Sequence, residues 1–361
     1  MRNFVEKICN HYATELNFSG VCMIKIKGET VFEKAYGYAN RAFKIKNEVD
    51  TSFDTASVTK VFTAVAVLQL VERGKLSLDD KIVNIIDLKG TKIPDDVTIE
   101  QLLNHTSGIA DDADEEAGED YAALFIHSPN YAIRECKDFL KNFAYKDPNF
   151  KAGTNVRYCN CSFVLLGLAI EKITGMKYQD YVTKNIFEKA GMTGTGFYSM
   201  DGINENTAEG YTNITDTDGS IIGYKKNIYS YPPTGTADSG AYTTADDLNR
   251  FLIGIQNGTL LNEQYFDILM HPHCNFYESK ENNQIPGLYK RNGYAFEFFM
   301  INDEKEPFCI YKDGCNYGVS AMFSYYPEKD ISLVLLSNQE CNVWAMRREI
   351  QLELYKKYYN Q

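Results

Sequence analysis

The chain has 361 residues, of which 44% are hydrophobic and 24% charged, a composition typical of folded globular proteins and unlike that of disordered chains. At roughly 100–200 residues per domain, this length predicts two lobes and a large core. The 37 basic and 49 acidic residues give a formal net charge of −12. Because the attraction that drives non-specific binding to phosphates is missing, nucleic acid is not an expected partner.

The N-terminal residues do not resemble a targeting segment. Glu6, Lys7 and Glu15 interrupt the apolar residues there, so the continuous apolar centre of a signal peptide is missing. No later run reaches the ~18 apolar residues that a membrane helix needs. We therefore expect a cytoplasmic protein without membrane contact, unless a leader was removed. The odd number of cysteines, scattered among apolar residues, predicts reduced thiols in the core.

The first predicted elements are a helix, two strands and a buried helix. Apolar residues recur at helical spacing at Val5, Ile8, Cys9, Tyr12 and Leu16. Residues 21–26 and 30–35 then predict two strands joined by a turn at Gly28. From Val58 to Glu72 the chain is apolar nearly all round, which predicts a buried helix that ends near Gly74. Ser57 stands at the N-terminus of this helix.

The middle of the chain, roughly 75–235, predicts short helices joined by loops. The expected helical segments are Ile99–Asn104, Tyr131–Phe143, Asn160–Thr174 and Tyr178–Ala190. The stretch Asp111–Asp120 contains seven acidic residues in ten. Such a run is typical of a solvated surface loop, and we interpret it as one.

The last third of the chain predicts strands again. A helix is expected at Thr244–Gly254, strands at Phe308–Lys312, Val319–Tyr326 and Ile331–Ser337, and a final helix at about Asn342–Tyr359. Strands at both ends of the chain predict an α+β fold with one sheet built from distant segments and an inserted helical lobe. We place the α/β domain at 1–58 and 236–361, the helical lobe at 59–235 and the active site between them.

Ser57 and Lys60 form the first candidate pair for chemistry. On a helix, residues i and i+3 share one face, so the Lys60 amine can take the Ser57 proton if burial or a second cation lowers the pKa of the lysine. The N-terminus of the helix favours negative charge on the serine oxygen. A capping serine followed by a snorkelling lysine explains this short pattern equally well when it is taken alone.

Two further patterns become meaningful only in combination with the first. Tyr158 and Asn160 precede an apolar helix and can project into one cleft, where the phenol moves protons and the amide holds a carbonyl. Lys312 and Gly314 end a strand. The lysine can bind a substrate carboxylate there, and the glycine allows a substrate backbone to approach closely. Taken singly, the first pattern is better interpreted as a core tyrosine with a helix-capping asparagine, and a surface turn explains the second pattern equally well.

Together and in this order, Ser57-x-x-Lys60, Tyr158-x-Asn160 and Lys312-Asp313-Gly314 resemble the three motifs of the serine β-lactamase and penicillin-binding protein superfamily, in the class C form. Further stretches are similar from about residue 18 to about 338, among them 103–109 and 239–248. The resemblance implies a mainly antiparallel sheet flanked by helices with an inserted helical lobe. It also implies a serine hydrolase that needs no cofactor and no metal.

Carried over to this sequence, the resemblance assigns a role to each residue of the motifs. Ser57 attacks a carbonyl, Lys60 and Tyr158 move the protons, and Asn160 and Lys312 orient the substrate. The backbone N–H groups of Ser57 and of the residue after the third motif form the oxyanion hole; that residue is Cys315.

One departure from the motifs bears on the substrate. Asp313 stands where penicillin-recognising members usually carry Thr or Ser, and its negative charge is expected to weaken β-lactam binding. An ester, amide or D-amino-acid peptide is therefore the preferred small-molecule or peptide substrate. The alternative is a penicillin-binding-like sensor that is acylated without turnover, since no deacylating carboxylate can be assigned from the sequence.

Rival sites are weaker. The run His271-Pro272-His273-Cys274 lacks the second ligand cluster of a structural zinc site, so no metal is expected. His105 is interpreted as a structural loop histidine. A cysteine nucleophile at Cys309 or Cys315 would need a paired histidine that the sequence does not suggest.

Overall fold

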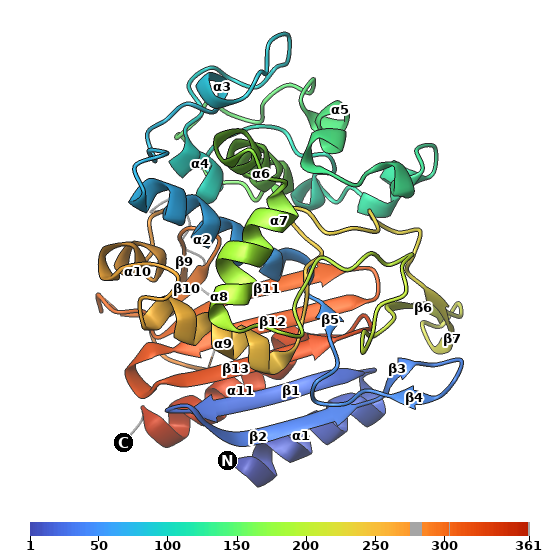
Figure 1. The fold of residues 1–361 in the computed structure, drawn as a ribbon. Coiled ribbons are helices and arrows are strands. Elements are labelled where there is room, and N and C mark those ends of the chain that lie inside the picture. Colours follow the sequence, from blue (N-terminus) through green and yellow to red (C-terminus); the bar gives the residue numbers. More distant parts are fainter. Residues whose placement is uncertain (275–283, 303, 360–361) are drawn as a thin grey trace.

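The computed structural model describes residues 1–274, 284–302 and 304–359. Within these residues the central element is a seven-stranded sheet of order β2-β1-β13-β12-β11-β10-β9, with antiparallel neighbours throughout (Figure 1). Its strands are β1 (Gly20–Ile26), β2 (Glu29–Tyr36), β9 (Leu288–Asn292), β10 (Glu297–Ile301), β11 (Cys309–Asn316), β12 (Val319–Tyr326) and β13 (Ile331–Ser337). Both ends of the chain thus build one sheet, which confirms the predicted fold class.

Three short ribbons lie outside this sheet, and each consists of two antiparallel strands. They pair β3 (Tyr38–Asn40) with β4 (Ile45–Lys46), β5 (Phe53–Asp54) with β8 (Tyr242–Thr243), and β6 (Tyr211–Thr215) with β7 (Ile221–Lys226). The β5–β8 ribbon joins the segment just before Ser57 to a distant part of the chain.

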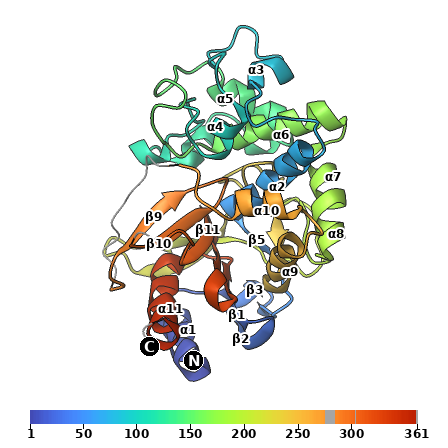
Figure 2. The same cartoon turned by 90° about the vertical axis from the view of Figure 1, so that its left-hand side faces the viewer.

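Helices cover both faces of the sheet, and a helical lobe lies at one end (Figures 1 and 2). The terminal helices α1 (Arg2–Glu15) and α11 (Val343–Tyr358) pack on one face, and α9 (Ala245–Gln256) packs on the other. The remaining helices are α2 (Thr59–Glu72), α3 (Ile82–Ile85), α4 (Ile99–Leu103), α5 (Leu140–Phe143), α6 (Asn160–Thr174), α7 (Tyr178–Val182), α8 (Glu188–Ala190) and α10 (Glu263–Leu269). No helix among the described residues has the length and apolarity to cross a membrane.

The sheet separates two hydrophobic cores because successive side chains of a strand point to opposite faces. In β1, Val21 and Met23 belong to the core that contains α2 and α9. Cys22 and Ile24 belong to the core beneath α1 and α11. Both faces of the sheet are therefore buried, which explains why its central strands are apolar without alternation.

Several predicted elements differ from the structure. The segment Tyr131–Phe143 is not one helix, because an extended residue at Ile133 separates 3₁₀ turns at Asn130–Ala132 and Cys136–Phe139. Strand β11 continues to Asn316, four residues past the predicted end, since Gly314 still pairs with Ala321 of β12. The edge strand β9, its neighbour β10 and the β6–β7 ribbon were not predicted. The domain limits stay a prediction.

The interpretation of Asp111–Asp120 as a solvated loop is wrong for its first residues. Asp111 is 7% and Asp112 1% exposed. The Asp111 carboxylate accepts hydrogen bonds from the backbone N–H groups of Asn160 (2.8 Å) and Cys161 (2.9 Å) at the start of α6. A carboxylate is favourable there because the first N–H groups of a helix lack partners within it. This contact brings the acidic segment next to Asn160.

Candidate active site

Ser57 lies in a 3₁₀ turn, Ala56–Val58, directly before α2. The preceding residue, Ala56, has φ +44°, an unfavourable value for a residue with a Cβ atom. Its N–H donates to Asp54 Oδ1 at 2.7 Å, and Tyr231 Oη donates to Asp54 Oδ2 at 2.9 Å. Burial raises the pKa of Asp54 to about 6. This bonded carboxylate holds the strained turn that presents the serine.

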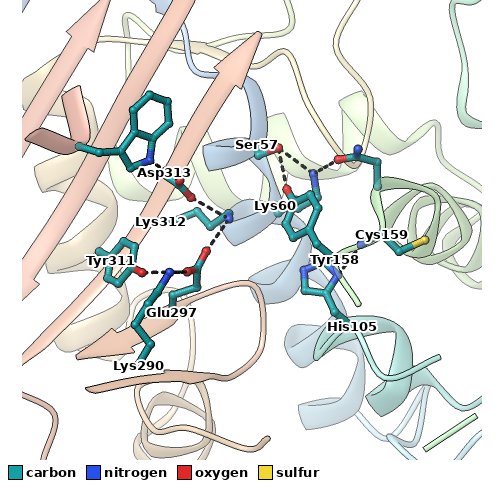
Figure 3. Close-up of polar contacts among 12 residues, drawn as sticks. Ser57, Lys60, His105, Tyr158, Cys159, Lys290, Glu297, Tyr311, Lys312 and Asp313 are labelled. Atoms are coloured by element: carbon teal, nitrogen blue, oxygen red, sulfur yellow. Dashed lines mark hydrogen bonds and ion pairs between the residues drawn. The ribbon is translucent and has the colours of Figure 1, made fainter. Parts of the chain in front are cut away.

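The Ser57 hydroxyl is within hydrogen-bond distance of an amine and a phenol (Figure 3). Lys60 Nζ donates to Ser57 Oγ at 3.0 Å, and Tyr158 Oη donates to the same oxygen at 2.8 Å. Lys60 Nζ also donates to Asn160 Oδ1 at 2.8 Å and to the Asp238 carbonyl at 2.6 Å. Lys60 is fully buried, with 0% of its surface exposed. All three N–H groups of an ammonium therefore have acceptors, and the amine is fixed toward the serine.

Tyr158 is held by its ring as well as by its oxygen. The His105 ring lies 4.5 Å from the Tyr158 ring between centroids, and His105 Nδ1 accepts the Cys159 N–H at 3.2 Å. Burial lowers the pKa of His105 to about 3, and the charges of Lys312 and Lys60 act in the same direction. A neutral His105 therefore fixes the segment that carries Tyr158, consistent with the structural role expected for it.

The third motif lies on β11 beside the turn that carries Ser57. An added Cβ at Gly314 would lie 2.1 Å from the Thr55 carbonyl oxygen and 3.0 Å from the Ser57 nitrogen. The close contact with the turn that carries Ser57 therefore requires a glycine at position 314, a reason that the sequence did not reveal. Lys312 Nζ lies 5.0 Å from the centre of the Tyr158 ring, and Lys60 Nζ lies 5.1 Å from it. The phenol is thus flanked by two cations.

Lys312 is itself paired with two carboxylates (Figure 3). Its Nζ lies 3.3 Å from Glu297 Oε1 and 3.2 Å from Asp313 Oδ1, and Trp344 Nε1 donates to Asp313 Oδ2 at 2.6 Å. Burial opposes the charge on Lys312, but Tyr158, Asp313 and Glu297 raise its pKa above the usual value overall. Lys290 forms a second ion pair with Glu297 at 2.9 Å. The lysine is a fixed ammonium within a charge network.

The sequence analysis missed Glu297, Lys290 and Trp344. Burial alone would raise the pKa of Glu297, but Lys312 and Lys290 lower it below its usual range. The available signal was a lone glutamate at the start of the apolar run Glu297–Ile301, which identifies no partner. Only the pairing of β10 with β11 brings the carboxylate to Lys312.

The possible metal ligands are engaged in other contacts. Asp111, Asp112 and Cys161 form the one close group of such side chains in the part of the chain that the structure describes. Lys146 Nζ donates to the carbonyls of Asp111 and Asp112 at 3.0 and 2.7 Å, and the Asp111 carboxylate caps α6. In the histidine-rich run, His273 is stacked on Tyr294.

The fold defines a class of protein: it is the β-lactamase fold, with a helical lobe above an antiparallel sheet. The family model described as Beta-lactamase matches residues 6–355, and the chain belongs to this family.

Relatives and solved structures agree with this assignment. The chain is 29% identical over 305 residues to PbpX of Bacillus subtilis (strain 168), covering 82% of this chain and 70% of the relative. It is 26% identical over 338 residues to Protein flp of Staphylococcus aureus (strain N315), covering 92% of this chain but only 62% of flp. A penicillin-binding protein from Bacillus halodurans has a similar structure, with a TM-score of 0.85, 33% identity, and 97% and 99% of the two chains covered.

The fold is also shared with proteins of lower sequence identity. The D-amino acid amidase from Ochrobactrum anthropi SV3 superposes with a TM-score of 0.77 at 20% identity, covering 98% of this chain and 99% of the amidase. The hydrolase EstCE1 superposes with the same TM-score at 20% identity, covering 98% of each chain. At these identities the likeness concerns the fold.

Proposed function

We propose that this chain is a serine acyl-hydrolase in which Ser57 forms a covalent acyl-enzyme that water then cleaves. One observation carries the proposal: Ser57 Oγ lies 3.0 Å from Lys60 Nζ and 2.8 Å from Tyr158 Oη. Both distances permit direct proton transfer. A serine with an adjacent proton acceptor is the arrangement that activates a hydroxyl as a nucleophile.

In the proposed mechanism the proton leaves Ser57 Oγ as the oxygen attacks the substrate carbonyl carbon. Tyr158 in its phenolate form takes this proton and then, as a phenol, gives it to the leaving group, while the Lys60 ammonium hydrogen-bonds to Ser57 Oγ. The negative charge of the phenolate is stabilised by the ammonium groups of Lys60 and Lys312, which lie 5.1 and 5.0 Å from the centre of the ring. Asn160 keeps Lys60 in place through its side-chain oxygen and lines the same pocket as Ser57.

The oxyanion of the tetrahedral intermediate is assigned to the backbone N–H groups of Ser57 and Cys315. The close approach of β11 at Gly314 to the Ser57 nitrogen supports this assignment, because it brings the two amides to one place. Backbone donors fixed by a strand and a turn stabilise the charge without reorganising. The Cys315 thiol has no part in this step, because only the backbone N–H of this residue is assigned to the oxyanion.

Esters and amides, including D-amino-acid derivatives, are the proposed substrates in preference to β-lactams. The Asp313 carboxylate lies 3.2 Å from Lys312 Nζ, the group that would bind the carboxylate of a β-lactam. Its negative charge disfavours a second carboxylate there. The shared fold with a D-amino acid amidase supports an amide or ester substrate.

Three measurements test this proposal. We expect a fluorophosphonate probe to label the wild-type protein and not the Ser57→Ala variant, and p-nitrophenyl acetate to be hydrolysed faster than nitrocefin. Failure to label folded protein would contradict the nucleophile, and faster turnover of nitrocefin would reverse the substrate ranking. Mass spectrometry over time separates turnover from sensing: a transient adduct on Ser57 supports the hydrolase, and a permanent one supports the sensor.

A further inference from the structure

The turn that carries Ser57 is bonded to a carboxylate that is buried without a cation beside it. Asp54 is 7% exposed and lies at the end of β5, shortly before Ser57 in the chain. The Ala56 N–H donates to one of its oxygens at 2.7 Å, and Tyr231 Oη donates to the other at 2.9 Å. No lysine, arginine or histidine in the described part of the chain acts on the pKa of Asp54. The charge is therefore held by hydrogen bonds alone.

These hydrogen bonds are arranged for the ionised form of Asp54. Asn227 Nδ2 donates to Tyr231 Oη at 2.9 Å, so the phenol hydrogen points to the carboxylate. The Ala56 N–H can only donate, and each carboxylate oxygen thus faces a donor. A protonated carboxyl would itself need an acceptor, and Tyr231 would have to turn its hydrogen away. Protonation therefore disturbs the contacts that reach the turn.

Two tyrosines are the titratable side chains beside Asp54 on the segments packed against it. Tyr231 contacts its carboxylate directly, and Tyr242 is its pairing partner on β8. Burial and the charge of Asp54 raise the pKa of both phenols well above the usual value. Both therefore stay neutral in the pH range in which a carboxyl titrates, and Asp54 is the group that changes its charge.

The ionised form of Asp54 reduces the stability of the fold. Burial raises its pKa from 3.8 to about 6, although its hydrogen bonds act in the opposite direction. Between these values the folded protein binds a proton that the unfolded chain has lost, so stability decreases as the pH rises through about 6. A buried charge that is kept at neutral pH against stability is typical of a functional site.

The charge acts on the residue directly before the nucleophile. Ala56 has a φ of +44°, in the left-handed region that a residue with a Cβ atom rarely adopts. Its N–H is fixed by the bond to Asp54, and a hydrogen bond to a charged acceptor is about twice as strong as a neutral one. We propose that Asp54 is a positioning residue whose negative charge holds Ala56 in this conformation, so that Ser57 is acylated at its full rate only while Asp54 is ionised. The inference rests on the proposed function, because acylation of Ser57 is the reaction it describes.

Asp54→Asn removes the charge and nearly keeps the shape of the side chain. We expect single-turnover acylation by p-nitrophenyl acetate to be about tenfold slower at about pH 8, the factor that separates a charged from a neutral hydrogen bond. Mass spectrometry of rapidly quenched samples measures the acetylated protein. The midpoint of denaturant unfolding should not fall, because the variant no longer buries a charge. A merely structural carboxylate would lose stability together with activity.

The ratio of the wild-type rate to the Asp54→Asn rate should depend on pH. Both proteins contain Lys60 and Tyr158, so the ratio cancels the titration of these groups. We expect it to rise from about twofold at about pH 5 to about tenfold at about pH 8, with a midpoint at about pH 6. In a Tyr231→Phe background the midpoint of the same ratio should move upward, because the lost hydrogen bond lowers the pKa of Asp54.

Two further variants show whether the charge acts through the turn. Glycine adopts positive φ without steric cost, so Asp54→Asn in an Ala56→Gly background should slow acylation less than about twofold. Asp247→Asn is the matched control. Asp247 is 3% exposed and accepts one backbone N–H, from Gly194, and one hydroxyl, from Thr195, both at 2.8 Å. It lines neither pocket that contains Ser57, so its variant should be acylated as fast as the wild type.

The outcomes separate this inference from the proposed function. A ratio that does not change with pH, or a tenfold loss that persists with Ala56→Gly, would overturn the inference even while Ser57 is acylated. Unfolding of Asp54→Asn at neutral pH, or an equal loss of acylation in Asp247→Asn, would also overturn it, since the carboxylate would then be structural. Absence of Ser57 acylation in the wild-type protein would refute the proposed function, and the inference with it.

Discussion

At the scale of single residues, the site depends on side chains whose protonation is set by burial. His105 is 5% exposed and stays neutral, with a pKa of about 3 in the folded protein against about 6.5 in an unfolded chain. Because only the unfolded chain takes up a proton between these values, the contribution of His105 to stability is complete above pH 6.5 and is lost as the pH falls. Acid should therefore lower the free energy of unfolding.

His105→Asn tests this dependence. Asparagine tolerates the positive φ of +61° at this position and does not titrate. We expect the variant to be less stable than the wild type at neutral pH, and this difference to shrink by about 1.4 kcal/mol per pH unit between about pH 6 and about pH 5. Denaturant unfolding at several pH values measures it. Parallel stability curves for the two proteins would show that His105 is protonated in the folded state.

At the scale of elements, the nucleophile is positioned by the contact between β11 and the 3₁₀ turn at Ala56–Val58. Gly314→Ala would place a methyl group 2.1 Å from the Thr55 carbonyl oxygen, so the strand and the turn must separate. We expect a loss of about 1–3 kcal/mol in the free energy of unfolding and a large loss of Ser57 acylation.

Gly223→Ala on β7 is the matched control. Its added Cβ would meet no atom closer than 3.7 Å, so the free energy of unfolding should change by no more than about 0.5 kcal/mol and acylation should be retained. If the Gly314 variant acylates as fast as this control, the close approach of β11 has no role in positioning Ser57.

At the scale of the whole molecule, the sequence predicted the elements whose patterns are local. Helix α6 and strands β12 and β13 lie where expected because they are long and apolar. Strand β10 was missed because a five-residue run has little pattern of its own. In the site, three motifs identified Ser57, Lys60, Tyr158 and Lys312, whereas the partner Glu297 depends on strand pairing, which no local pattern contains. The burial of Asp111 likewise follows from its contact with α6, 49 residues away in sequence.

The central claim is that Ser57, Lys60 and Tyr158 act as one unit in acylation. Its most direct test is the single-turnover acylation rate with p-nitrophenyl acetate for Lys60→Ala, Tyr158→Phe and the double variant. We expect the acylation rate to fall about 10²–10⁴-fold in each single variant. The double variant should lose little more, because substitutions of groups that act in one proton transfer do not have additive effects on the rate. Wild-type rates in either single variant, or losses that multiply in the double variant, would contradict the account.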